Sequence, residues 1–342
     1  MSNRAELAAQ FLGQTDWKDA ARGPLAGDAS NRRYERLQDL ATGNTAILMD
    51  APTERGEDVV PFVQITAHLR AVGLSAPQII AQDTANGFLL LEDLGDALFA
   101  RAVVQNPACE VILYEAAVDV LVSLQRDPPP PGLTVYDAAA MSKAATLGHD
   151  WYGHGLTGGK ATENSAALVD IMTPLLRSIE DDFQVIALRD YHAENLIWLN
   201  QRAGNNRVGL LDYQDAQICH PAYDLASLLE DARRDVPADL ARVMIDRFIH
   251  ATGADSCEFH RAYALTGVQR NLRILGIFAR LSLHFGKPQY VDLIPRTWAH
   301  LMQGLSHPAL NKLRDQVLKD LPPPTPENLT ILKEKCASIP TL

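Results

Sequence analysis

Residues 189–195 read Arg-Asp-Tyr-His-Ala-Glu-Asn, and Leu-Asp-Tyr follows at residues 211–213. The two apolar runs between these stretches, residues 196–199 and 208–211, predict two neighbouring strands joined by a turn. A hairpin of this kind brings the residue before its first strand close to the residue after its second strand. The sequence therefore predicts that polar side chains from both quoted stretches lie together.

Three of these polar side chains, Asp190, Asn195 and Asp212, have the types and the order that phosphoryl transfer requires. One carboxylate orients the proton of the attacking hydroxyl, while an amide oxygen and a second carboxylate hold Mg²⁺ over the phosphates of a nucleotide. The kinase signature has His before the Arg-Asp pair and Gly two residues after the metal-binding Asp, where this chain has Leu188 and Gln214. We predict Asp190 as the catalytic base and Asn195 and Asp212 as Mg²⁺ ligands. The competing interpretation is a polar turn beside an unrelated hairpin.

Apolar periodicity divides the chain into a strand-rich part and a helix-rich part. Strands are predicted at residues 33–40, 44–49, 78–82 and 88–92, with helices at 3–13 and 58–72. Helical spacing then predominates at residues 108–125, 162–180, 222–234, 237–251, 257–280 and 289–305. We therefore predict an α+β fold with a small antiparallel-sheet N-lobe at residues 1–93 and a large helical C-lobe at residues 94–342.

Composition restricts the partners and the location of the protein. The formal net charge of the 342 residues is -11, and no Lys/Arg block stands out, so a nucleic acid is not an expected partner. We found neither a signal peptide nor an apolar run of about 20 residues, so we expect a cytoplasmic protein without a membrane span. The four cysteines lack metal-ligand spacing. The oligomeric state is left open.

A polar loop before residue 34 is the predicted nucleotide loop. Residues 27–34 are small and polar, which lets backbone N–H groups approach phosphates, although a plain β-turn fits the same residues. The third strand should offer a lysine to the phosphates, but residues 46–52 contain none, and residues 61–65 lack its glutamate partner. Either the site is degenerate or an arginine meets the phosphate charge. The predicted cofactor-binding residues are Ser30, Asn31, Arg32, Arg33 and, on the strand that connects the lobes, Glu92 and Leu94.

These motifs resemble those of the aminoglycoside phosphotransferase and choline kinase-like family over nearly the whole chain. The family's catalytic loop reads His-Gly-Asp-x-His-x-x-Asn, and this chain matches it with Arg189 at the Gly position and His192 at the second His. Residues 211–216 match the family's Ile-Asp-Trp-Glu-x-Ala, and residues 220–226 resemble Gly-Asp-Pro-x-x-Asp-Leu-Ala. The resemblance implies a protein-kinase-like two-lobe fold that uses ATP and Mg²⁺. It also agrees with a loop-bracing role for Asp224.

Two residues near this loop each have two competing interpretations. We favour a loop-shaping role for His192 over a metal ligand. Asp215 is interpreted either as a second metal contact or as a solvated acid.

Four longer sequence segments indicate one group within this family. Residues 27–34, 48–52, 211–216 and 269–280 are similar to those of bacterial anomeric sugar kinases of cell-wall recycling. That resemblance implies phosphorylation of N-acetylmuramate or N-acetylglucosamine at the C1 hydroxyl. These kinases also commonly lack the third-strand lysine.

A sugar site needs polar groups and an aromatic face, and the carboxylate of muramate suits an arginine. We name Asp150, Trp151 and Arg273 as substrate contacts. The competing interpretations are core packing for the aromatic residue and a solvated helix face for Arg270, Arg273 and Arg280.

Other functions compete with the sugar kinase. One is an aminoglycoside or choline kinase of the same fold. Another is a non-catalytic nucleotide-binding protein, suggested by the missing lysine. A metal-dependent hydrolase using Asp190, His192 and Asp212 is disfavoured, because no second histidine cluster is present.

Overall fold

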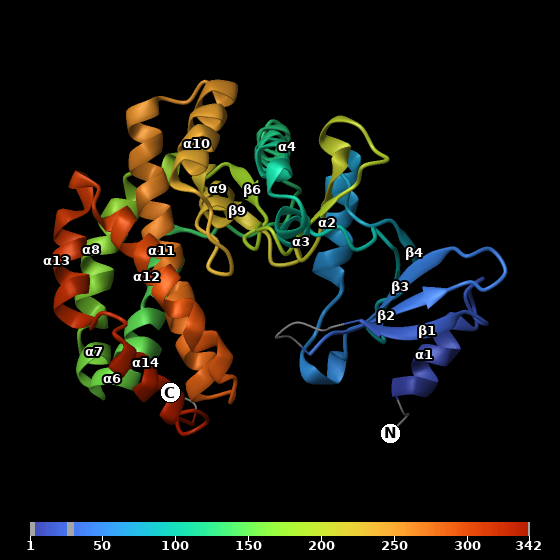
Figure 1. The fold of residues 1–342 in the computed structure, drawn as a ribbon, viewed down its shortest axis with the longest axis horizontal. Helices are drawn as coiled ribbons and strands as arrows, with labels where there is room; N and C mark the ends of the chain where they lie inside the picture. The colour runs from blue at the N-terminus through green and yellow to red at the C-terminus, as the bar shows by residue number, and fades with distance from the viewer. Residues whose placement is uncertain (1–3, 26–30, 341–342) are drawn as a thin grey trace. The chain divides into compact units, whose positions relative to one another are not determined.

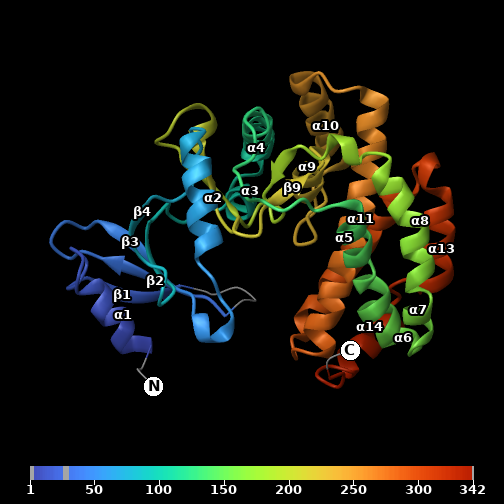
Figure 2. The same cartoon turned by 180° about the vertical axis from the view of Figure 1, so that it is seen from behind.

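A computed structural model describes residues 4–25 and 31–340 of the chain (Figures 1 and 2). It divides into two compact units. The first unit contains Met1–Val120 and Ala193–Ala216, and the second contains Leu121–His192 and Gln217–Leu342. The predicted division into an N-lobe and a C-lobe between residues 93 and 94 stays a prediction. The compact units are defined by spatial contacts instead, and the first unit also includes residues 94–120 and 193–216.

The first unit is built on a five-stranded antiparallel sheet (Figure 1). Alternate residues of a strand face opposite sides of a sheet, so Leu37, Leu48 and Leu90 pack on one side against helix α1 (Arg4–Leu12). The opposite side is left for a pocket. The strand order is β1 (Ala21–Leu25), β2 (Arg33–Gln38), β3 (Thr45–Asp50), β5 (Phe88–Glu92) and β4 (Ile79–Asp83).

Strand β1 is an element that periodicity did not predict. Gly23 and Pro24 lie within it and normally break a strand. Proline is tolerated on an edge strand, where its missing N–H does not interrupt a ladder on both sides. Strand β1 is such an edge and pairs only with β2, with Pro24 opposite Glu35.

The rest of the first unit joins the sheet to a short hairpin. The predicted hairpin is confirmed as β7 (Leu196–Trp198) and β8 (Val208–Leu210), which pair antiparallel. Bridges between Leu98 and Ile197 and between Ser75 and Gly209 tie this hairpin to residues far away in sequence. The helical elements are η1 (Thr53–Arg55), α2 (Val60–Ala71), α3 (Phe99–Gln105), η2 (Pro107–Cys109), α4 (Glu110–Leu124), which continues into the second unit, and η5 (Gly204–Arg207).

The second unit is mostly helical and is organised around the 28-residue helix α11 (Ser256–Leu283). Helix α12 (Ile294–Leu305) runs beside it in both views (Figures 1 and 2). Strands β6 (Val185–Ala187) and β9 (Gln217–Cys219) pair antiparallel. The other elements are α5 (Ala138–Ala145), the π-helix η3 (Gly148–Gly153), α6 (His154–Thr157), α7 (Lys160–Glu163), α8 (Ser165–Arg177), η4 (Glu180–Asp182), α9 (Ala222–Leu229), α10 (Ala238–Thr252), η6 (Pro288–Leu293), η7 (Pro308–Leu310), α13 (Asn311–Asp320) and α14 (Pro326–Glu334).

The helix predicted at residues 222–234 ends five residues early, at Leu229. The Asp231 carboxylate accepts a hydrogen bond of 2.8 Å from the backbone N–H of Arg233. This local side-chain bond offers the backbone an alternative to the helix. Across the described residues, no helix is long and apolar enough to cross a membrane.

Candidate active site

The hairpin of the first unit brings Asn195 and Asp212 together as predicted. A hydrogen bond of 3.0 Å from the Leu211 N–H to the Asn195 carbonyl extends the β7–β8 ladder by one step. The Asn195 Nδ2 and Asp212 Oδ2 atoms are consequently 3.5 Å apart. Both residues line a pocket of about 310 Å³ that lies within the first unit.

This pair fits a hard cation that prefers oxygen ligands. Mg²⁺ is commonly bound through one or two protein side chains together with phosphate oxygens and water. Asp212 supplies a carboxylate. Asn195 supplies an amide, and a rotation of this amide by about 180° exchanges its nitrogen and oxygen, so that the oxygen faces the metal position. The described residues contain no group of three His, Cys, Asp or Glu side chains that could hold a metal. The pair therefore suits a metal that a nucleotide brings with it.

The two residues that follow Asp212 explain how its carboxylate is held. Its backbone is in the left-handed region, with φ of 56°. The Tyr213 ring stacks on Phe62 of α2 at a centroid distance of 4.9 Å, and its hydroxyl lies 2.7 Å from Thr66 Oγ1. Gln214, where the kinase signature has glycine, donates a hydrogen bond of 2.9 Å to Asp212 Oδ1. The departure from glycine thus adds a side chain that orients the carboxylate predicted to bind the metal.

The pocket beside this pair lies on the sheet face opposite α1. Strand β3 turns Ile47 and Met49 toward the pocket, while Leu48 packs against α1 on the other face. Glu92 and Leu94, both predicted cofactor contacts, line the pocket. No lysine is found among the described residues that line it. The apolar lining comprises Leu25, Ile47, Met49, Phe62, Pro77, Leu91, Leu94, Leu98, Ile197 and Leu211.

Arg36 is a pocket residue that sequence reasoning missed. Its guanidinium lies 2.7 Å from the Asp93 carboxylate and 2.9 Å from that of Asp96. The hydrogen bond to Asp96 is the main cause of a raised Arg36 pKa, despite some burial, and Asp93 adds to it. Two carboxylates therefore neutralise this cation. Its signal in the sequence is weak, since its partners lie 57 and 60 residues away.

Arg32 is the predicted phosphate-binding residue that the structure places most clearly. Its Nε lies 2.9 Å from Glu57 Oε2, and the side chains are only 11% and 13% exposed. Burial alone lowers the Arg32 pKa, but Tyr34, Glu57 and Asp212 outweigh it, so the pKa is raised. Arg32 is thus within electrostatic reach of Asp212.

The other residues of the predicted loop are less informative. The Asn31 N–H donates to the Glu57 carboxylate at 3.1 Å. Arg33 is exposed at the start of β2. Like Arg32, neither Asn31 nor Arg33 lines the pocket. Ser30 lies outside the described residues.

In the second unit, the loop that carries Asp190 is braced by a buried carboxylate. Asp224 Oδ2 and Oδ1 accept hydrogen bonds of 2.6 and 2.8 Å from the backbone N–H groups of Leu188 and Arg189. The hydroxyl of Ser227 donates to the Arg189 carbonyl at 3.1 Å. Burial raises the pKa of Asp224 to about 7, although the two backbone hydrogen bonds act to lower it. This bracing role agrees with the family resemblance.

Arg189 itself is in an unusual backbone conformation. Its φ of 73° lies in the left-handed region, which favours the glycine found in the family motif. The guanidinium carbon of Arg189 lies 4.9 Å from the centroid of the Tyr136 ring, a cation–π contact. The bonds from Asp224 and Ser227 hold the strained backbone that precedes Asp190.

His192 is buried in the second unit. Its Nε2 lies 3.3 Å from Arg233 Nη1, and burial lowers its pKa well below the usual value. A guanidinium this close disfavours a metal cation at the same nitrogen. The loop-shaping interpretation therefore remains the favoured one. In the first unit, Asp215 is exposed and does not line the pocket.

The three predicted substrate contacts belong to the second unit. Trp151 is 6% exposed, lies in the main hydrophobic core and has its ring 5.9 Å from His284. Asp150 accepts a hydrogen bond of 2.9 Å from the Thr146 hydroxyl. Arg273 is half-buried on α11. None of the three lines either pocket described here, so their roles stay predictions.

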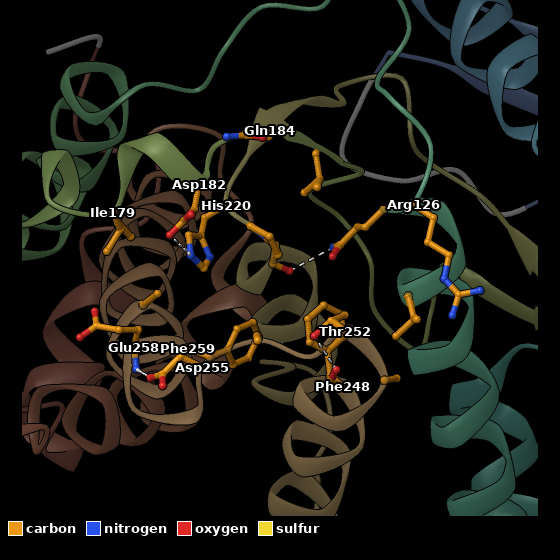
Figure 3. A pocket seen from close by; sticks show the side chains of 17 residues that line it. Arg126, Ile179, Asp182, Gln184, His220, Phe248, Thr252, Asp255, Glu258 and Phe259 are labelled. Carbon is orange, nitrogen blue, oxygen red and sulfur yellow. Dashed lines mark hydrogen bonds and ion pairs between the residues drawn. The ribbon is translucent and has the colours of Figure 1, made fainter.

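A second cavity, of about 560 Å³, also lies in the second unit (Figure 3). Figure 3 shows His220 and Asp182 on one side of it and Phe248 with Thr252 on another. His220 Nδ1 accepts a hydrogen bond of 3.0 Å from the Ala222 N–H, and burial lowers the His220 pKa to about 4. The cavity is lined by none of the predicted catalytic, metal or cofactor residues. Volume alone therefore does not locate the active site.

Comparisons with known proteins place the chain in a family. Residues 22–263 match the model of the phosphotransferase enzyme family. The chain is 38% identical to the N-acetylmuramate/N-acetylglucosamine kinase of Caulobacter vibrioides, covering 92% of this chain and 95% of that protein. It is 35% identical to the protein of that name from Pseudomonas aeruginosa, covering 87% and 88%.

Solved structures show the same fold at low identity. A microcompartment-associated aminopropanol kinase superposes with a TM-score of 0.64 at 14% identity, covering 91% of this chain and 99% of that one. The choline kinase LicA from Streptococcus pneumoniae superposes with a TM-score of 0.61 at 14% identity, covering 88% and 100%. The predicted protein-kinase-like α+β fold is confirmed. The family match and the curated relatives show that the chain belongs to the phosphotransferase enzyme family.

Proposed function

We propose that this protein is an ATP- and Mg²⁺-dependent kinase that phosphorylates an amino sugar, with N-acetylmuramate and N-acetylglucosamine as the favoured acceptors and their C1 hydroxyl as the favoured position. Membership of the phosphotransferase family and the names of the curated relatives support a kinase acting on a small molecule. The observation that carries the proposal is the Asn195–Asp212 pair in a nucleotide-sized pocket.

In this proposal the nucleotide occupies the pocket of the first unit. The apolar side chains of β3 and β5 pack on the base, and the backbone at Glu92 and Leu94 pairs with its edge. Asn195 and Asp212 would hold Mg²⁺, which would neutralise negative charge on the phosphate oxygens, and Gln214 keeps the Asp212 carboxylate oriented.

Arg32 takes over the task of the missing third-strand lysine. Kinases normally hold that lysine with a glutamate of the following helix. Here the Arg32–Glu57 pair has the same charges and precedes α2 rather than lying on it. The low exposure of both side chains keeps their attraction from being screened by water.

Asp190 would orient the acceptor hydroxyl and take its proton as the oxygen bonds to the γ-phosphorus of ATP, while the bond to the bridging oxygen breaks and ADP leaves. Phosphoryl transfer depends mainly on positioning and charge stabilisation, so the base must be held accurately. Asp224 and Ser227 supply that rigidity through the backbone of the preceding residues. This is the part that the second unit contributes.

The test is ADP release by the purified chain with ATP and Mg²⁺. N-acetylmuramate, N-acetylglucosamine, an aminoglycoside and choline are compared as acceptors, and NMR locates the phosphate on the product. We expect turnover with the two amino sugars and phosphate at C1. Turnover with the aminoglycoside or choline alone contradicts the proposed acceptor. Tight nucleotide binding without ADP release for a broad sugar panel identifies a non-catalytic nucleotide-binding protein instead.

A further inference from the structure

Helix α11 carries two arginines on a half-buried stripe. Arg273 and Arg280 are seven residues apart, about two helical turns, so they lie on the same side of the helix. Ile277, Leu281 and His284 continue this stripe and are also half-buried, whereas the other positions between Arg273 and His284 are fully buried. The stripe is therefore the part of this core helix that a solute can reach.

The stripe runs beside the π-helix η3, which carries two of the predicted substrate contacts. Helix α11 approaches the start of η3 so closely that a Cβ on Gly276 would lie 2.1 Å from the Leu147 carbonyl oxygen. Further along, the Trp151 ring of η3 lies 5.9 Å from His284 at the end of the stripe. An aromatic residue and the two arginines thus belong to neighbouring segments.

The charge on this stripe is uncompensated at Arg280. Its Nε is buried, and among the described residues it has neither a hydrogen-bond partner nor an ion pair. Other arginines differ, since Arg296 pairs with Asp235 at 2.6 Å. Burial lowers the pKa of Arg280, and the charge of Arg273 lowers it further. Keeping the Arg280 cation half-buried within electrostatic reach of a second cation is unfavourable unless an anion binds to it.

The stripe is also connected to the catalytic loop. Arg273 is near enough to Tyr136 to act on the pKa of its hydroxyl, which burial raises to about 12. The guanidinium of Arg189 covers the same Tyr136 ring, and Arg189 immediately precedes Asp190. The stripe and the residue that precedes the base therefore both lie near the Tyr136 ring of the second unit.

We propose that Arg273 and Arg280 form a binding site for a carboxylate on the acceptor, and that this site makes the enzyme prefer an acidic amino sugar over its neutral counterpart. The inference rests on the proposed function. Guanidinium groups bind carboxylates through two parallel, charge-assisted hydrogen bonds. N-acetylmuramate differs from N-acetylglucosamine by a lactyl ether that ends in a carboxylate. Comparing the two sugars as acceptors therefore measures the contribution of this carboxylate.

The experiment compares the two sugars with wild-type protein, Arg280→Gln, Arg273→Gln and the control Arg261→Gln. Arg261 lies on the same helix, but it is paired with Glu258 at 2.6 Å near the helix start. We measure kcat/KM by ADP release and the sugar Kd by calorimetry. For Arg280→Gln, the muramate-to-glucosamine ratio of kcat/KM should fall at least 10-fold, mainly through KM. The Arg261→Gln ratio should stay within about 2-fold of wild type.

The outcomes separate this inference from the proposed function. If both sugars lose the same factor in Arg280→Gln, Arg280 has a structural role and the inference is wrong. An unchanged ratio in both Arg273→Gln and Arg280→Gln also overturns it. If the wild-type protein phosphorylates neither sugar, the proposed function is wrong. The sugar Kd values from calorimetry then test the carboxylate site independently of turnover. The carboxylate site is rejected if the wild-type protein does not bind N-acetylmuramate. It is also rejected if the arginine variants bind N-acetylmuramate as tightly as the wild-type protein does.

Discussion

The Asn195–Asp212 pair of the first unit and the Asp190 loop of the second unit are held in different ways. The pair is oriented by side chains, namely the Gln214 amide and the anchored Tyr213 ring, beside an accessible pocket. The Asp190 loop is held through its backbone by Asp224 and Ser227, which are buried. The difference teaches that side-chain contacts can orient two neighbouring ligand groups beside a pocket, whereas a loop residue is positioned through its backbone.

The largest expected effect comes from removing the base. Asp190→Asn keeps the shape of the side chain but cannot accept the hydroxyl proton, so kcat should fall about 10²–10⁴-fold. ATP affinity, measured by calorimetry with Mg²⁺, should stay within about 3-fold, because the nucleotide pocket belongs to the first unit. Turnover near the wild-type rate excludes Asp190 as the base.

Loss of the metal carboxylate should affect binding first. Asp212→Ala should weaken Mg²⁺-dependent ATP binding about 10–100-fold, because one of two protein ligands is removed. Binding without Mg²⁺ should change little, which calorimetry in the presence of a chelator measures. Asp215→Ala, at an exposed neighbouring carboxylate, is the matched control. Equal magnesium dependence in wild type and Asp212→Ala removes this residue from the metal site.

The Arg32–Glu57 pair predicts a smaller effect on the nucleotide. Arg32→Gln should raise the KM for ATP about 10-fold, since a charge-assisted contact to phosphate is worth about 1.5–3 kcal/mol. Glu57→Gln should have a weaker effect in the same direction, because the arginine loses the partner that orients it. Arg33→Gln, at an exposed neighbouring arginine, is the control. If Arg33→Gln has the larger effect, the phosphate charge is met there.

The Ser227 hydroxyl tests whether the backbone of the catalytic loop needs bracing. It donates to the Arg189 carbonyl and accepts from Arg270 at 2.8 Å. Ser227→Ala should lower kcat about 5-fold, with the KM for ATP unchanged, and should reduce the free energy of unfolding by about 1 kcal/mol. Ser227→Thr should restore most of kcat. A loss of stability without a change in kcat shows a purely structural hydroxyl.

The smallest expected effect concerns the strained residue before the base. Arg189→Gly relieves the positive φ, worth about 1–2 kcal/mol, but loses the contact with Tyr136 and gives the unfolded chain more freedom. We therefore expect a net change in the free energy of unfolding of less than about 1 kcal/mol, measured by urea denaturation. Arg189→Ala keeps the strain and loses the ring contact, so it should be less stable than Arg189→Gly. The opposite order shows that the strain is not relieved.

The hairpin was predictable because its signal is local. Two apolar runs with a polar turn between them predict β7 and β8, and ladder geometry then puts Asn195 beside Asp212. Strand β1 was missed because Pro24 is compatible with a strand only at a sheet edge. An edge position is a property of the whole sheet and cannot be read from neighbouring residues.

Sequence alone therefore determined the chemical groups of the site, their order and the short elements that carry them, because the spacing of side chains along a strand or loop follows from local backbone geometry. Tertiary structure decided which charges are paired and which are not. Arg32 meets Glu57, Arg36 meets Asp93 and Asp96, and Arg280 lies within electrostatic reach of Arg273 without an acidic partner among the described residues. These pairings depend on burial and on contacts between distant segments, and burial sets how strongly each charge acts.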